Sequence, residues 1–475
     1  MGEPTRWDRG LSVTTDGKHL VGHAGALLLR KLADRTGLTA TLTAALPTST
    51  ARSWRQRAHV LVHLAVAIAL GARSLLEAER LHLHHRHLFA TPASDSTLHR
   101  TLDALDEKTM AAINKARRHV RRHVWSLLRL RPGGFPDLEA AGRDLKGRIA
   151  VDLDATVITS ASKKQGAEPT FKGTFGFHPL AAWCANTGEC LAMELRPGNA
   201  GANTVADRIR VLAAALDQIP GSSAAKLLIR ADGAGATHGL LEHLEALTTT
   251  RRTVRYTAGW KITGEDGAAI ARLPEDAWET SLTQAGNLQE GYEVAEQTGL
   301  NTRQGWPQGL RLIVRRVRPS RRHKKNLTAF ERTTGWRYSV TATNIGRMRG
   351  IAGSHQVQFL DALHRNHAGV EDRVRTNKAM GLHRLPSAFW QVNRGWVLAA
   401  NIACDLDAWP RLLTLHDHDD LAGAEPQTMR FRLYHLPARL ARHARRRILR
   451  LDRTWPWAEV FATCWRRLSG LPAAG

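Results

Sequence analysis

The order of apolar runs in the middle of the chain restricts its possible folds more than any other feature. Three runs of strand-like composition are followed by a helical run, a fourth strand-like run and a second helical run. In chain order these runs are 148–154, 174–183, 189–195, 203–217, 226–231 and 238–247. Short β-like runs that give way to helical patterns predict an α/β domain built on a central sheet.

The chain is strongly basic, with 68 Lys and Arg residues against 43 Asp and Glu, and a formal net charge of +25. A charge of this size predicts a polyanionic partner. A membrane is the less favoured partner because the best apolar stretch, 60–70, is about half of the length needed to cross a bilayer and includes His63. We therefore expect double-stranded DNA as the partner and no membrane.

Cysteine usage and the first residues indicate the compartment. Cys184, Cys190, Cys404 and Cys464 form no CxxC pair, which is typical of a reducing compartment and argues against a zinc site. The N-terminal residues lack the apolar core of a signal peptide. We expect a cytoplasmic protein.

The order of strands and helices is the one expected of a ribonuclease H-like core, and the flanking segments differ from it in texture. The fold class that we predict is α/β, with a helical DNA-binding domain before the core, a mostly β insertion within it, and a basic helical C-terminal region. The predicted boundaries are 1–145 for the helical domain, 146–254 for the first part of the core, 255–345 for the insertion, 346–410 for the second part of the core and 411–475 for the basic region. Within the last region, 437–451 predicts an amphipathic helix with a basic outer face.

Two helical patterns of the N-terminal region are separated by a short break. The second begins after Ser94 or Asp95, either of which can cap it, and carries Arg100. A helix-turn-helix would place Arg100 near DNA. The alternative is two packed helices of an all-α domain, and the sequence favours neither clearly.

Three acidic residues lie where a metal-dependent nuclease needs them. Asp154 ends the first predicted strand, Asp232 directly follows the fourth, and Glu371 lies on a predicted helix. Two carboxylates at strand ends and a third on a helix can hold two Mg²⁺ ions beside a phosphodiester. This arrangement predicts phosphodiester chemistry.

The first strand offers two candidate ligands on one face, because Asp152 and Asp154 alternate with apolar residues. We choose Asp154, which lies nearest the strand end, and regard Asp152 as a neighbour that orients it. The alternative is that both face solvent. Asp232 precedes a Gly-rich turn. An aspartate before glycine is also common in turns that have no catalytic role, which is the alternative for this residue.

The helix around Glu371 predicts a cationic stripe. Positions four and seven residues away on the same helical face are His364, His367, Arg375 and Lys378. Arg365 and Arg373 lie nearby in sequence and add to the charge. Such a stripe suits a carboxylate that works beside a phosphate backbone, and an exposed salt-bridged helix face is the alternative.

Five segments together carry a family resemblance, namely 151–157, 171–180, 196–203, 229–235 and 371–382. In order and spacing they resemble the DDE transposases of bacterial insertion sequences, most closely the thirteen-eighty group within the insertion sequence four-like superfamily. The resemblance covers roughly residues 20 to 470. It implies a ribonuclease H-like catalytic core with a β insertion between the second and third acids.

The resemblance implies that Asp154, Asp232 and Glu371 are the three catalytic acids and bind two Mg²⁺ (or Mn²⁺) ions. The family pattern around the glutamate is Tyr-x2-Arg-x3-Glu-x6-Lys. Lys378 keeps the lysine, whereas His364 and His367 stand at the tyrosine and arginine positions.

The resemblance also implies DNA contacts, an assembly and a place of action. A tryptophan of the insertion, Trp260, can stack on a flipped base, although packing in the insertion core is the more ordinary role. The transposon terminal inverted repeats and the target DNA are the implied partners, bound by a homodimer associated with the bacterial chromosome. The candidate DNA-binding residues are Lys172, Arg230, His364, Arg365, His367, Arg373, Arg375, Lys378, Arg100 and Trp260.

The implied activity is cutting of transposon ends by hydrolysis, followed by joining of the freed 3′-hydroxyl to target DNA at the same metal pair. Two other hypotheses remain. One is a catalytically inactive, transposase-derived protein that binds DNA sequence-specifically. The other is a structure-selective nuclease without strand transfer.

Overall fold

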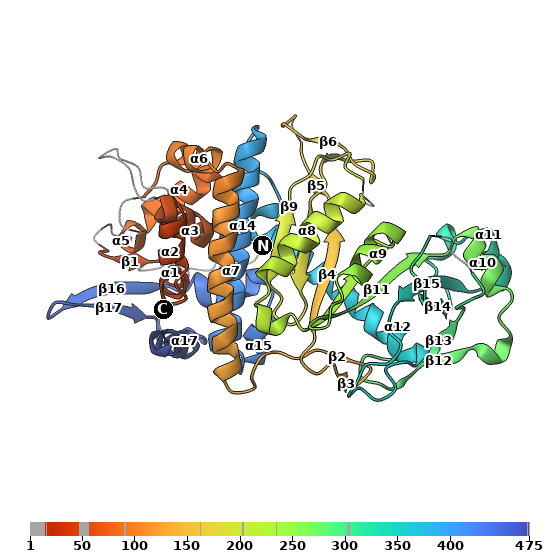
Figure 1. The fold of residues 1–475 in the computed structure, drawn as a ribbon. Coiled ribbons are helices and arrows are strands. Elements are labelled where there is room, and N and C mark those ends of the chain that lie inside the picture. The colour runs from red at the N-terminus through yellow and green to blue at the C-terminus, as the bar shows by residue number, and fades with distance from the viewer. Residues whose placement is uncertain are drawn as a thin grey trace, which may run out of the picture.

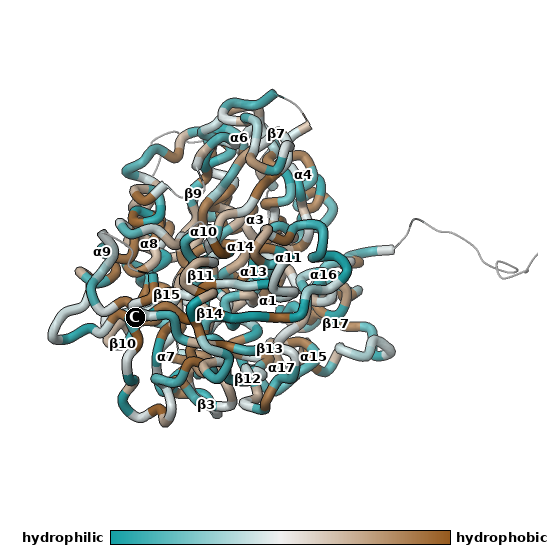
Figure 2. The backbone as a smooth tube through the Cα atoms, turned by 90° about the vertical axis from the view of Figure 1, so that its right-hand side faces the viewer, coloured by the Kyte–Doolittle hydropathy of each residue, from teal (hydrophilic) through white to brown (hydrophobic). Residues whose placement is uncertain are grey.

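A computed structural model describes residues 15, 17–46, 57–89, 92–161, 163–201, 204–233, 235–301, 305–472 and 474. A large mixed sheet runs from the middle of the molecule into the β-rich segment, and a bundle of helices lies at its other end (Figure 1). Hydrophilic segments lie mainly in outer loops, and apolar segments lie toward the interior (Figure 2). No helix among these residues has the length and apolar character needed to cross a membrane.

The central sheet has nine strands in the order β12-β13-β14-β15-β11-β10-β4-β8-β9. In chain order these strands are β4 (Ile149–Ala155), β8 (Leu180–Cys184), β9 (Cys190–Glu194), β10 (Lys226–Ala231), β11 (Thr253–Lys261), β12 (Glu279–Leu282), β13 (Leu288–Glu296), β14 (Arg311–Val317) and β15 (Arg337–Thr343). β4, β10 and β11 run parallel to one another. β8 is antiparallel to β4, and β9 pairs antiparallel with β8, so it runs in the same direction as β4. The sheet therefore has a parallel centre, and both Asp154 and Asp232 lie at the carboxyl ends of its strands.

The two faces of β4 and β10 have different chemistry. Val151 and Ile229 belong to the large apolar core, which also takes in residues of α8 (Val205–Gln218) and α9 (His238–Ala246). The opposite face carries polar residues at alternate positions and lies toward α12 (Val357–Arg365) and α13 (Val370–Asn377). A short 3₁₀ turn, Asn366–Gly369, separates these two helices, which the sequence predicted as one.

The N-terminal region is helical, as predicted. Its helices are α1 (Gly25–Arg35), α2 (Leu38–Ala45), α3 (Arg57–Ala69), α4 (Leu75–His84), α5 (Arg86–Phe89), α6 (Asp95–Asp103) and α7 (Glu107–Leu130). The Ser94 side chain caps α6 by accepting from the backbone of Thr97, which is one of the two caps that the sequence offered. Two small sheets lie outside the central one. The pair β2 (Glu139–Ala140) and β3 (Arg143–Asp144) precedes β4 in the chain. The second small sheet, between β4 and β8 in the chain, pairs β7 (Phe175–Phe177) with β5 (Ile158–Thr159) and β6 (Glu168–Pro169).

A long helix, α14 (Trp390–Thr414), joins the helical region to the sheet (Figure 1). Its Asp405 accepts hydrogen bonds from Arg117 and Arg121 of α7, at 2.8 and 2.6 Å. Glu189, in the turn before β9, accepts from Arg121 and from the indole of Trp409 at 2.8 Å each. This buried network holds α7, α14 and the edge of the sheet together.

The β-rich insertion continues the central sheet. The predicted start of the insertion lies in β11, and this strand pairs parallel with β10 along the whole length of β10. β12–β15 then extend the same sheet, with α10 (Gly264–Ile270) and α11 (Ala329–Thr334) beside them. The expected boundary at residue 255 therefore falls inside a central strand.

The prediction of a helix over 437–451 is wrong. This segment forms a hairpin of β16 (Ala438–His443) and β17 (Arg446–Leu451), and β1 (Leu20–Val21) pairs with β16. The remaining C-terminal elements are helical: α15 (Asp419–Ala422), α16 (Pro426–Met429) and α17 (Ala458–Gly470). Apolar residues four apart can form a helical stripe, but Leu449 and Leu451 also fit the two-residue period of a strand, and that pattern is the one the chain adopts.

Candidate active site

Asp154 and Asp232 lie side by side at the edge of the sheet. In the parallel pairing of β4 and β10, Leu153 is opposite Ala231, and each aspartate is the next residue of its chain. Side chains alternate between the two faces of a strand, and both aspartates fall on the polar face of the sheet. The strand register therefore brings two carboxylates together that are 78 positions apart in sequence.

The two carboxylates are not fully compensated by positive charge. Burial and the negative charge of Asp232 raise the pKa of Asp154 to about 6. The guanidinium of Arg208, on α8, lies 3.6 Å from Asp232 and forms an ion pair with it. Asp154 accepts a hydrogen bond from the backbone nitrogen of Ala155 at 2.7 Å. The two neighbouring acids thus share the positive charge of Arg208.

This pair fits a divalent cation. Carboxylate oxygens are the ligands that Mg²⁺ and Mn²⁺ prefer, and a bound cation would relieve the like-charge repulsion that raises the pKa of Asp154. In the described part of the chain, no group of three His, Cys, Asp or Glu side chains is close enough to form a complete metal cage. A cation bound by the pair alone would therefore need further ligands.

Glu371 lies in the first turn of α13, and its carboxylate is exposed. The preceding residue, Val370, packs in a small apolar cluster with Ala181 and Trp183 of β8. Ala181 is the register partner of Asp154, so α13 begins on the same side of the sheet as the aspartate. The structure brings the helix to the site but does not group the Glu371 carboxylate with the other two.

Asp152 is the centre of a buried cluster of hydrogen bonds and ion pairs. It is buried and accepts from the guanidinium of Arg230 at 2.6 and 2.9 Å, from His367 at 3.1 Å, and from Arg373. Burial opposes ionisation, but the charge of Arg230 and the hydrogen bonds hold the pKa of Asp152 well below its usual range. This cluster joins β4, β10 and the Glu371 helix, and it orients the surroundings of Asp154.

Several residues that we predicted to contact DNA are therefore directed into the protein. Arg230 is buried, and both Arg373 and His367 are engaged with Asp152. Arg365 pairs with the buried carboxylate of Asp361 at 2.8 Å. In this conformation none of these four side chains is placed to meet a phosphate.

His364 is also internal. Its ring nitrogen lies 3.0 Å from the hydroxyl of Thr257, and burial, followed by the charge of His367, lowers its pKa to about 3. A side chain at position 259 would place its Cβ 2.1 Å from His364, so Gly259 permits this contact. His364 is neutral near pH 7 and supplies no charge to the stripe.

Other predicted contacts are exposed or paired at the surface. Arg375 is exposed and pairs with Glu425 at 2.7 Å and Asp372 at 3.0 Å. Arg100 is exposed on α6 and donates to the carbonyl of Ser96 at 3.3 Å. Both guanidinium groups lie on the surface, where a phosphate can reach them.

Lys172 and Lys378 lie near each other. Burial, and then the positive charge of Lys172, lowers the pKa of Lys378. Phe171, beside Lys172, is 68% exposed, with the lysine nitrogen 5.6 Å from its ring centre. Phe171 is thus an exposed aromatic ring beside lysines that we predicted to contact DNA, and it was not itself predicted because a single Phe-Lys pair carries no pattern.

Trp260 is half-buried at the end of β11. Its indole donates to Asp266 at 2.9 Å, and its ring lies 5.6 Å from that of Trp306. It also borders the turn after Asp232, since a Cβ at Gly233 would lie 3.4 Å from the Trp260 backbone. These contacts are those of a packed residue of the insertion.

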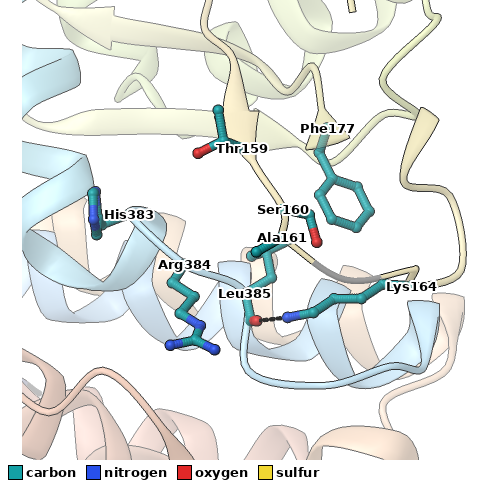
Figure 3. Close-up of a pocket in the computed structure, with 8 residues that line it drawn as sticks. All are labelled: Thr159, Ser160, Ala161, Lys164, Phe177, His383, Arg384 and Leu385. Carbon is teal, nitrogen blue, oxygen red and sulfur yellow. Dashed lines mark hydrogen bonds between the residues drawn. The ribbon is translucent and has the colours of Figure 1, made fainter. Parts of the chain in front are cut away.

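A hollow of about 260 Å³ lies where the chain continues beyond Asp154 and beyond Lys378 (Figure 3). Lys164 and Arg384 approach it from facing segments, and the Lys164 amine donates to the carbonyl of Leu385. Burial and the charge of Arg384 lower the pKa of Lys164. An adjoining hollow of about 410 Å³ shares these two cations and adds Arg73. The cationic surface therefore continues past the acidic pair.

Comparison with known protein families identifies the family of this chain. The family model described as Transposase DDE domain group 1 matches residues 4–473, and the chain belongs to this family. Among solved structures, the chain is similar to the cryo-EM structure of the piggyBac transposase synaptic complex with hairpin DNA, with 11% sequence identity and a TM-score of 0.38. That likeness covers 86% of this chain and 78% of the other. No curated protein matches the sequence.

Proposed function

We propose that this protein is a DNA transposase that cuts transposon ends and joins them to target DNA with two divalent metal ions. The observation that carries the proposal is the pair of under-compensated carboxylates, Asp154 and Asp232, at adjacent strand ends of a chain in a DDE transposase family. Perturbed carboxylates at a sheet edge are typical of catalytic sites. The thirteen-eighty group is the branch of this family that the sequence segments favour.

The topology supports a ribonuclease H-like core. In the segment β9-β8-β4-β10-β11, four strands run in one direction and β8 runs in the other, with the first strand, β4, in the middle. The sequence predicted the chain order of these strands and helices, and their order within the sheet adds support to the proposed core. In it, the carboxyl ends of the first and fourth strands carry the first two acids.

We assign Asp154, Asp232 and Glu371 as ligands of the metal pair. When bound, the two ions would activate the attacking water or 3′-hydroxyl and stabilise the leaving oxygen. Asp154 and Asp232 provide anionic oxygens on a rigid sheet. No ion pair holds Glu371 among the described residues, whereas its neighbour Asp372 pairs with Arg375 at 3.0 Å. The Glu371 side chain is therefore free to turn toward the aspartates.

Surface cations provide the DNA path. Lys172 and Lys378 lie on the segments next to the acids, and Lys164 and Arg384 extend the positive surface beyond them. Charge neutralisation by such groups positions a phosphate backbone without reading its sequence. We propose terminal inverted repeats and target DNA as the substrates, bound by a homodimer that holds two ends.

The adjacent acids Glu371 and Asp372 permit a matched test. Both are exposed and one position apart, so Glu371→Gln and Asp372→Asn remove the same charge from the same helix turn. With duplex DNA that carries the element's end and Mg²⁺ or Mn²⁺, we expect Glu371→Gln to lower cleavage by about 10³-fold or more, because a metal ligand is lost. Asp372→Asn should cleave within a few-fold of the wild type.

Asp232→Asn should likewise abolish cleavage and retain end binding. Equal losses for Glu371→Gln and Asp372→Asn would contradict the assignment of Glu371. Wild-type protein that binds ends but never nicks them would indicate instead a transposase-derived DNA-binding protein. Pre-cut ends that are never joined to target DNA would indicate a nuclease without strand transfer.

A further inference from the structure

The β16–β17 hairpin is a cationic ribbon that projects from the helical side of the molecule (Figure 1). Between Ala438 and Leu451 the sequence contains no acidic residue. Its cations are Arg439, Arg442, His443, Arg445, Arg446, Arg447 and Arg450. None of the six arginines forms an ion pair with a carboxylate within the described ranges, although arginines elsewhere in the protein often do.

The strand register places like charges directly opposite each other. Arg439 faces Arg450, and Arg442 faces Arg447. Opposed like charges destabilise an antiparallel pair. The ribbon therefore carries a repulsion that a polyanion lying along it would relieve.

The base of the ribbon is well anchored, so this charge is held in a fixed position. Leu440 and Leu449 face each other across the strands, and both pack against the apolar core. β1 pairs with the start of β16, and Arg447 donates to the carbonyl of His87 at 3.0 Å. The tip turns through Ala444 and Arg445, both at positive φ (44° and 65°), and is exposed.

We propose that the β16–β17 ribbon binds the phosphate backbone of duplex DNA at a distance from the acidic pair. A two-stranded ribbon has the width to enter the major groove, and arginines on its flanks meet phosphates on both sides. This inference rests on the proposed function for its choice of polyanion. The ribbon lies beyond the N-terminal helices from β4 and β10 (Figure 1), so it would contact DNA outside the cleavage point.

The test measures binding in EDTA, where no cleavage occurs, so that its result does not depend on catalysis. The ribbon variant combines Arg442→Gln, Arg446→Gln and Arg450→Gln, three exposed side chains. By counterion release, each phosphate contact contributes roughly eightfold to affinity near 0.1 M salt. We expect the triple variant to bind duplex DNA on the order of 100-fold more weakly by fluorescence anisotropy. The slope of log K against log salt should fall by about 2 to 3.

The matched control removes the same charge elsewhere. Lys226, Arg251 and Arg252 lie at the amino-terminal ends of β10 and β11, at the opposite edge of the sheet from Asp232. Changing all three to Gln should alter affinity by less than about threefold, since it removes only long-range attraction that salt screens. Three arginine-to-lysine changes in the ribbon should retain most of the binding.

A folding readout separates loss of contact from loss of structure. Because the substitutions remove cross-strand repulsion, the thermal midpoint of the ribbon variant at low salt should equal or exceed that of the wild type. Equal DNA affinity of the ribbon variant and the control would overturn the proposal. The proposal would also be overturned if the ribbon variant kept its DNA binding but lost binding to anionic lipid vesicles. A wild type that binds DNA through the ribbon but never cleaves it would refute the proposed function and leave the ribbon inference intact.

Discussion

Two groups of buried or half-buried carboxylates next to the central sheet are built in opposite ways. Glu189 and Asp405 face Arg121 and Arg117, so that two negative charges meet two positive ones. Glu189 also accepts hydrogen bonds from two indoles, those of Trp125 and Trp409. Although burial opposes its ionisation, the charge of Arg121 and these bonds lower the pKa of Glu189.

Asp154 and Asp232 have less compensating positive charge beside them than Glu189 and Asp405 have. Arg208 lies 3.6 Å from Asp232, and the pKa of Asp154 is raised to about 6. The contrast teaches that this protein can fully neutralise buried acids where it needs stability. At the carboxyl ends of β4 and β10 it does not, and the remaining charge is available to a ligand.

Removing a compensated acid should have the larger effect on stability. Glu189→Gln leaves Arg121 and two indoles without an anionic partner, so we expect a loss of about 3–5 kcal/mol in the free energy of unfolding. Chemical denaturation at pH 7 measures it. Asp217→Asn is the control, since Asp217 forms a surface pair with Arg118 and should cost less than about 1 kcal/mol. A loss for Glu189→Gln no greater than that of the control would remove the contrast.

Removing an under-compensated acid should stabilise the protein. Ionised Asp154 destabilises the folded state, because its folded pKa of about 6 exceeds the usual aspartate pKa of 3.8. The difference corresponds to roughly 3 kcal/mol, so we expect Asp154→Asn to raise stability by up to that amount at pH 7.

The pH dependence sharpens this prediction. The folded state binds the Asp154 proton more tightly than the unfolded state, so stability falls as pH rises from about 4 to about 6 and stays low above it. The gain from Asp154→Asn should therefore be small at pH 4 and complete by pH 7. A gain that is equal at both pH values would have another origin.

Adding a divalent cation should change stability less than either substitution, Glu189→Gln or Asp154→Asn. Mg²⁺ at millimolar concentration should raise the thermal midpoint of the wild type above pH 6, by an amount equivalent to about 1 kcal/mol. It should have no such effect on Asp154→Asn, and Ca²⁺ can serve as a non-catalytic comparison. A Mg²⁺ shift that survives Asp154→Asn would place the ion elsewhere.

The sequence predicted the elements of the core well because their patterns are local. The run 226–231 is β10, and 238–247 differs from α9 by one residue at its end. Strong apolar runs bounded by glycine, proline or caps predict such elements without knowledge of their neighbours. These patterns placed Asp154 and Asp232 at strand ends, and the pairing of β4 with β10 makes those ends adjacent.

The partners of charged residues could not be predicted, because they depend on contacts between distant segments. Arg230 has the sequence context of a DNA contact, yet it is buried against Asp152 by the register of β4 and β10. Arg208 gave no signal at all, although it lies beside Asp232. The β16–β17 hairpin was missed for a local reason, since its turn uses Ala444 and Arg445 at positive φ rather than glycine or asparagine.

Direct measurement of Mn²⁺ binding by electron paramagnetic resonance tests the central claim, that Asp154 and Asp232 together form a divalent metal site. At pH 7.5 and without DNA, the wild type should bind Mn²⁺, while Asp154→Asn and Asp232→Asn should each lose that binding and Asp372→Asn should keep it. Mn²⁺ binding by Asp154→Asn that is equal to that of the wild type would contradict the account.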